Sequence, residues 1–187
     1  MRINERSYPL GRETEPTRLG SRMTLHYYSF LGRGLCKVSI SGCMNAKDLL
    51  RSAKVEVAAE TFALVGMTRA GLLELLGDNS LSPRMSAPFM IFMDPHEVTL
   101  ILDEIDLSNM RPGLATAKIE NGYRMLTFNI VLELSVVGFM AEVSRILADA
   151  GVTILALSSY SRDSLLIKQE DLAAALKALG PFVDEVC

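Results

Sequence analysis

The sequence predicts an α+β fold built from two units, each with the order strand, helix, strand hairpin, helix. The clearest evidence is residues 124–180, where an alternating strand, an amphipathic helix, a hairpin and a second amphipathic helix follow one another. A weaker copy of this order spans residues 54–114, although the two halves share few identical residues. Two such units can pair their sheets side by side and so bury strand edges.

The composition predicts a well-packed apolar core and argues against several kinds of partner. The 187 residues are 49% hydrophobic and carry a net charge of −3. Lys and Arg do not gather in one stripe, so we expect no nucleic-acid partner. No apolar run reaches the roughly 18 residues that a membrane span requires. We therefore expect a soluble, cytoplasmic protein that does not enter a membrane.

Few side chains can support metal or catalytic chemistry. Cys36, Cys43 and Cys187 are odd in number and have no paired spacing, and His26 and His96 are the only histidines. Such a set favours neither a disulfide framework nor a zinc site. We expect no metal, no cofactor and no catalytic residue.

The first 53 residues divide into a leader, 1–22, and an extension, 23–53. The leader is rich in Arg, Pro and Gly, which predicts a flexible segment; an organelle-targeting peptide is the alternative, against which three Glu argue. In the extension, two strand-like runs separated by glycines cover residues 25–31 and 35–40. Asn45 is a suitable cap for a helix that follows it.

Residues 54–114 are predicted to form the first domain. Residues 56–67 contain many β-formers and predict a strand. Thr68 can then cap a short helix that Gly77 ends. We expect four leucines of this helix to be buried, namely Leu72, Leu73, Leu75 and Leu76.

The first domain is predicted to continue with a hairpin and a helical turn. Residues 89–93 and 98–102 are apolar runs on either side of the turn sequence Asp-Pro-His, which predicts a β-hairpin. Residues 106–110 predict one helical turn, which Pro112 stops.

Residues 115–187 are predicted to form the second domain. Asn121-Gly122 predicts a hairpin turn into a strand over residues 123–134. The segments that follow alternate in the expected way: a helix at 139–150, strands at 152–160 and 164–168, a helix from Asp171 to Gly180, and an edge strand at 182–186.

The most suggestive local feature is the point at which the strand gives way to the helix at residue 139. The first N–H groups of a helix lack intrahelical partners and carry the positive end of the helix dipole, which favours a bound carboxylate. Gly138 has no Cβ and lets a ligand approach the backbone. The alternative is a purely structural turn, with Ser135 as a helix cap.

The run S-V-V-G-F-M-A-E-V-S-R-I-L-A-D-A-G-V, followed by the strands I-L-A-L-S-S-Y-S-R-D and S-L-L-I-K, resembles an ACT domain. ACT domains are regulatory modules that bind amino acids in aspartate kinase and other biosynthetic enzymes. More narrowly, the chain resembles tandem stand-alone ACT proteins related to the cytosolic arginine sensors. The resemblance implies a ferredoxin-like βαββαβ fold, with two ACT-like domains pairing side by side.

The resemblance also implies a ligand site between the domains, at the first strand-helix turn and the following hairpin. In the usual form of this turn an Asp stands where this chain has Ser135, and a Pro where it has Val137. Asp163 could supply the missing negative charge, although a solvated turn is the alternative role for it. The implied ligand-binding residues are Ser135, Val136, Val137, Gly138, Phe139, Ser158, Ser159, Tyr160 and Asp163.

These observations favour a non-catalytic, amino-acid-binding regulatory or sensor protein that forms a homo-oligomer or acts on a regulated protein partner. The alternative is a structural adaptor or oligomerisation module without a small-molecule ligand, in which Val136, Val137 and Phe139 fill the pocket. An enzyme on the same fold is disfavoured because the sequence offers no nucleophile, base or metal set.

Overall fold

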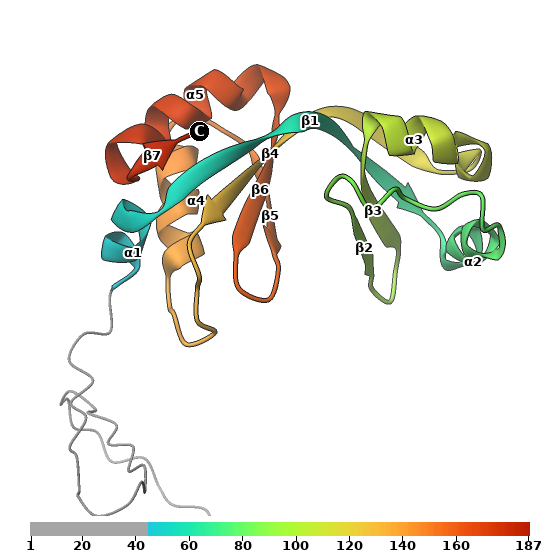
Figure 1. Cartoon of the computed structure of the whole chain (residues 1–187), viewed down its shortest axis with the longest axis horizontal. Helices are drawn as coiled ribbons and strands as arrows, with labels where there is room; N and C mark the ends of the chain where they lie inside the picture. Colours follow the sequence, from blue (N-terminus) through green and yellow to red (C-terminus); the bar gives the residue numbers. More distant parts are fainter. Residues whose placement is uncertain (1–44) are drawn as a thin grey trace, which may run out of the picture. The chain divides into compact units, whose positions relative to one another are not determined.

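The structure is a computed structural model that describes residues 45–187 (Figure 1). The predicted leader and the two strand-like runs at 25–31 and 35–40 lie outside the described residues, as do Cys36, Cys43 and His26. Of the extension, only its end is described. Asn45 there caps the first helix, because its side chain accepts a hydrogen bond from the Asp48 N–H at 2.9 Å, as predicted.

The described residues form an α+β structure whose element order confirms the prediction. The helices are α1 (Ala46–Ser52), α2 (Arg69–Gly77), α3 (Glu104–Met110), α4 (Phe139–Asp149) and α5 (Leu172–Leu179), with 3₁₀ turns η1 (Arg111–Leu114), η2 (Gln169–Asp171) and η3 (Gly180–Phe182). The strands are β1 (Lys54–Met67), β2 (Met90–Met93), β3 (Val98–Asp103), β4 (Lys118–Asn129), β5 (Ile154–Ser158), β6 (Asp163–Lys168) and β7 (Glu185–Val186).

The strands form one sheet in the order β2-β3-β1-β4-β6-β5, and β7 pairs in parallel with the start of β1. All the other pairs are antiparallel. The elements β1-α2-β2-β3-α3-β4 and β4-α4-β5-β6-α5-β7 each follow the ferredoxin-like order βαββαβ. We call them the first half and the second half.

The long strands β1 and β4 belong to both halves. Near its start, Lys54 of β1 pairs with Asn129, and towards its end Gly66 pairs with Lys118. A pair of strands that runs through both halves makes the sheet continuous. The predicted division between residues 114 and 115 falls just before β4 and stays a prediction.

The helices cover one face of the sheet, over two apolar cores. In the second half, Val55, Leu126 and Leu165 pack with α1, α4 and α5. In the first half, Ala63 and Val65 pack with α2 and α3. Neighbouring residues in a strand point to opposite faces. A third cluster, formed by Phe62, Ile101, Tyr123, Met125 and Leu166, therefore lies on the face away from the helices.

Three local predictions are wrong. Asn121-Gly122 does not form a hairpin turn, because β4 continues through it as a bulge, with Gly122 at φ +83°. Across this bulge, Glu120 pairs with Leu64 and Tyr123 with Phe62, so β4 carries one more residue than β1. In α2, Leu72 and Leu75 are buried, but Leu73 and Leu76 are exposed.

The third error concerns the end of β4. The predicted strand ran to residue 134, whereas β4 ends at Asn129 and residues 130–138 form a loop before α4. Leu126 and Phe128 are buried in the core, but Leu134, which continues the same alternation, is exposed. The alternating pattern thus continues beyond the last paired residues of β4, which are Thr127 opposite Ser164 of β6 and Asn129 opposite Lys54 of β1.

Candidate functional site

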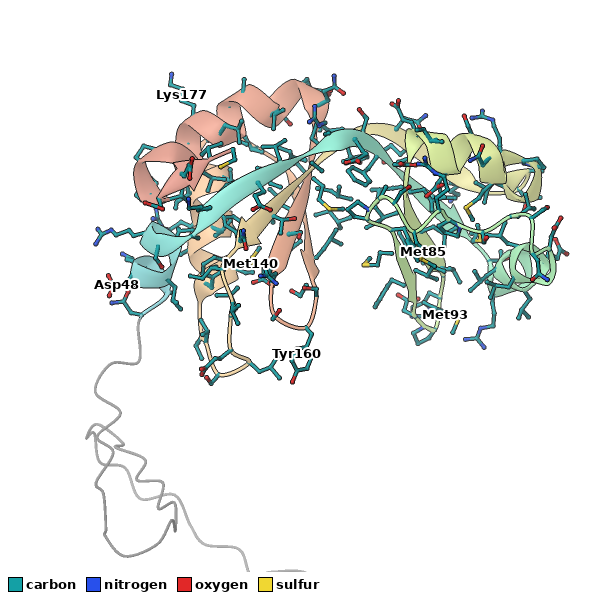
Figure 2. All side chains as sticks on the ribbon, viewed as in Figure 1. Asp48, Met85, Met93, Met140, Tyr160 and Lys177 are labelled. Carbon is teal, nitrogen blue, oxygen red and sulfur yellow. The ribbon has the colours of Figure 1, made fainter. Side chains whose placement is uncertain are left out.

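The loop before α4 and the β5–β6 turn together surround a cavity of about 360 Å³. Figure 2 labels Met140 in the first turn of α4 and Tyr160 in the β5–β6 turn, on the two sides of this region. Seven of the residues implied by the resemblance line the cavity: Val136, Gly138, Phe139, Ser158, Ser159, Tyr160 and Asp163. Every lining residue belongs to the second half.

The backbone at Gly138 leaves the start of α4 open. Gly138 is the N-cap residue, has φ +89° and makes no side-chain cap. The first hydrogen bond of the helix runs from the Glu142 N–H to the Gly138 carbonyl at 3.0 Å. The N–H groups of Phe139, Met140 and Ala141 therefore have no partner within the helix, and all three residues line the cavity. This end of the cavity is suited to an anionic group.

The cavity also carries three charged side chains, from Glu133, Arg162 and Asp163. The Ser158 hydroxyl donates a 2.6 Å hydrogen bond to Asp163 Oδ1. The Arg162 Nε donates to Asn129 Oδ1 at 3.3 Å. Two carboxylates against one guanidinium make the lining suited to a cationic group as well as to an anion at the helix end.

Hydrogen bonds hold the β5–β6 turn against the loop. Within the turn, the Ser159 hydroxyl donates to the Arg162 carbonyl at 3.0 Å and accepts from the Arg162 N–H at 3.2 Å. The Leu132 N–H donates to the Ser161 carbonyl at 2.9 Å and so ties the loop to the turn. The two walls of the cavity are thus connected directly.

Two of the implied residues do not line the cavity. The side chain of Val137 is 89% exposed, and the Ser135 hydroxyl donates to Glu133 Oε2 at 3.4 Å. Phe139 is buried and packs edge-on against Phe128, with ring centroids 5.3 Å apart. These positions leave the cavity open, so the alternative in which Val136, Val137 and Phe139 fill it does not describe this structure.

Sequence reasoning missed half of the lining, namely Leu132, Glu133, Leu134, Met140, Ala141, Ser161 and Arg162. Leu132, Glu133 and Leu134 were missed because they were assigned to a strand, whereas they lie in the loop. The sequence signal for Arg162 was its position next to Asp163 in the predicted turn.

Within residues 45–187, no group of three or more His, Cys, Asp or Glu side chains is placed to hold a metal ion. Over the same residues, no helix has the length and apolar character to cross a membrane.

Comparison with known proteins agrees with the geometry of the second half. The family model of the ACT domain matches residues 118–180, which span β4, α4, the β5–β6 hairpin and α5. No curated protein matches this sequence.

Several solved structures share the fold. The regulatory subunit of aspartate kinase from Thermus thermophilus, in its ligand-free form, has a TM-score of 0.52 and 17% identity, covering 71% of this chain and 98% of that one. A protein of unknown function from Vibrio cholerae has a TM-score of 0.53 and 23% identity, covering 72% of this chain and 93% of that one.

A protein from Agobacterium tumefaciens has a TM-score of 0.54 and 12% identity, covering 73% of this chain and 92% of that one. The resemblance predicted from the sequence is therefore confirmed: residues 118–180 match the ACT domain family, and the described residues share their fold with the regulatory subunit of an aspartate kinase.

Proposed function

We propose that this chain is a non-catalytic regulator that binds an amino acid in the cavity between the loop at 130–138 and the β5–β6 turn. The observation that carries the proposal is the N-terminus of α4 at Gly138, which has no side-chain cap and whose first three residues, with N–H groups that have no partner within the helix, line the cavity. These groups would donate hydrogen bonds to the α-carboxylate of the ligand.

The remaining charges fit the other end of an amino acid. Glu133 and Asp163 would face the α-ammonium group or a basic side chain, and the Ser158 hydrogen bond holds the Asp163 carboxylate in one orientation. Glu133 thereby takes over the role of the carboxylate that Ser135 lacks. A ligand with both charges satisfies both ends of the cavity, whereas a simple anion or cation satisfies one.

The ACT match and the fold shared with a regulatory subunit support a regulatory role in general. The identity of the amino acid, a homo-oligomeric state, a regulated partner protein and a cytoplasmic location are predictions that go with this proposal. From the sequence we expected the ligand to lie between two domains. We now propose a site within the second half, because all residues that line the cavity come from that half.

A thermal-shift screen of the twenty amino acids tests the proposal. A ligand that binds only the folded state stabilises it by about 2.7 kcal/mol at 100 times its Kd, so a genuine ligand raises the Tm in a concentration-dependent way. We expect the response to be lost in Asp163→Asn and Glu133→Gln and kept in Asp171→Asn, whose side chain caps no helix. If no amino acid raises the Tm at millimolar concentration, the proposal fails.

The alternative, an adaptor or oligomerisation module, is favoured by one observation at the edge of the sheet. Residues 85–93 carry no charge, and β2 exposes Ile91, Phe92 and Met93. Natural edge strands are usually protected by charges or covered. Size-exclusion chromatography with light scattering distinguishes the two functions: an oligomer that no amino acid stabilises would favour the adaptor.

A further inference from the structure

A second cavity, of about 180 Å³, lies in the first half and shares no lining residue with the first. Its floor is formed by buried side chains of the first-half core, among them Leu75, Leu100, Leu102 and Met110. Leu76 and Ile91, which are 60% and 43% exposed, also line it and lie at its mouth. The proposed amino-acid site makes no use of this cavity.

One wall of the cavity is held in place by the protein itself. The loop after α2 begins with a turn in which Asp78 Oδ1 accepts from the Ser80 N–H at 2.9 Å and from the Ser80 hydroxyl at 2.6 Å. Arg84, directly after the wall, donates to Asp106 Oδ1 at 2.7 Å and to Asp103 Oδ2 at 2.5 Å. Both carboxylates are buried. The cavity is therefore formed before any ligand arrives, as is usual for small-molecule sites.

The size and polarity of the cavity define the class of ligand. Apolar cavities of about 150 Å³ take up molecules the size of benzene. The polar lining consists of Asp78, Asn79 and Ser82, and Asp78 is the charged residue among them. The hydrogen bonds from Ser80 lower the pKa of Asp78, so this carboxylate is ionised at neutral pH. We propose that the cavity binds a short aliphatic molecule with a neutral or positively charged head group.

Gly113 offers a way to close the cavity without disturbing its mouth. A Cβ at this position would lie 2.7 Å from Leu75 Cδ1 and 2.8 Å from Leu81 Cδ1. Both leucines line the cavity, and both contacts are with the ends of flexible side chains. In Gly113→Ala we expect these side chains to turn into the cavity and occupy the space of the ligand. Gly77→Ala is the matched control, because its Cβ would meet nothing within 4 Å.

The methionines give a direct readout in the full chain. Met110 lines the second cavity, Met140 lines the first, and Met85 is 87% exposed. With ¹³C-methyl-labelled methionine, the full-length protein is titrated with n-pentylamine, 1-pentanol and pentanoate, and the methyl resonances are followed by NMR.

We expect the amine and the alcohol to shift the Met110 resonance saturably, at about millimolar concentration, while Met140 and Met85 stay in place. Pentanoate should bind more weakly, because its carboxylate faces Asp78. Gly113→Ala should weaken the response about tenfold or more, and Gly77→Ala should keep it. The proposed site is contradicted if the Met110 resonance does not shift with any probe, or if it shifts in Gly113→Ala as it does in the parent protein. Equal responses to all three probes overturn the head-group selectivity.

Discussion

The two strand-to-helix junctions of this protein, β1–α2 and β4–α4, occupy equivalent places in the two halves but differ in what they leave free. At β1–α2, Thr68 follows the strand directly, and its side chain accepts from the Gly71 N–H at 3.1 Å. At β4–α4, a loop intervenes and Gly138 makes no side-chain cap. The first junction thus provides a side-chain cap for its own helix, whereas the second leaves the first N–H groups of its helix without one.

The hairpin turns that follow these junctions, β2–β3 and β5–β6, also differ in how their Asp side chains are used. In the β2–β3 turn, Asp94 Oδ1 accepts from the N–H groups of His96 and Glu97 at 2.7 and 2.8 Å. In the β5–β6 hairpin, Asp163 accepts from a side chain, Ser158, and lines a cavity. The same order of elements therefore produces a junction with a side-chain cap in the first half and a candidate binding site in the second. The difference lies in the residue at the N-cap position, Thr68 or Gly138.

The largest expected effect concerns the buried charges of the first half. Arg84→Met leaves the buried Asp103 and Asp106 without their guanidinium, so we expect it to lower the free energy of unfolding more than any other single change described below. Arg145→Met, which breaks the pairs of an exposed side chain with Glu142 and Asp149 in the second half, should lower the free energy of unfolding far less. Urea unfolding of both variants measures the difference, and equal costs would contradict it.

Gly138→Ala is expected to have the next largest effect, because Gly138 has a positive φ. An L-residue in the left-handed region costs roughly 1–2 kcal/mol, and the Tm increase caused by an amino acid should shrink or disappear. Gly151→Ala is the control: it has φ +73° and lies at the other end of α4. It should lose similar stability and keep the full ligand response. A Gly138→Ala protein that responds like the parent would rule out the helix end as the ligand site.

Thr68→Ala tests the other junction. Loss of the cap should cost about 1 kcal/mol, whereas Thr68→Ser should cost much less because its hydroxyl can take over the bond. Neither change should alter the response to amino acids, since Thr68 lines no part of the second-half cavity. A changed ligand response in Thr68→Ala would mean that the two junctions are coupled, which contradicts a second-half site that is independent of Thr68.

Sequence reasoning predicted the elements better than the site. The helix caps Asn45 and Thr68 are local chemistry, and both were predicted correctly. The Asn121-Gly122 bulge was missed because the same dipeptide suits a hairpin turn, and only the pairing of β4 with β1 decides between the two. Glu133 was missed because an alternating pattern does not show where the partner strand ends. Both errors concern long-range pairing, which a local pattern does not specify.

The smallest effect is expected from the exposed pair between Glu120 and Lys168, which lies beside the bulge where the two halves meet. Lys168 Nζ lies 2.7 Å from Glu120 Oε1 and 4.0 Å from the centre of the Tyr123 ring. The hydrogen bond to Lys168 lowers the pKa of Glu120, and the same bond raises the pKa of Lys168.

The sign of the pH dependence follows from these directions. A depressed carboxyl pKa gives stability that is present above the ordinary glutamate value of 4.5 and is lost as the pH falls through the lower folded value. The Tm difference between the parent and Glu120→Gln should therefore be small but positive at pH 7 and close to zero well below pH 4.5. Salt should reduce it at pH 7, because exposed pairs are screened. A difference that persists at low pH would show that Glu120 stabilises the bulge through packing rather than charge.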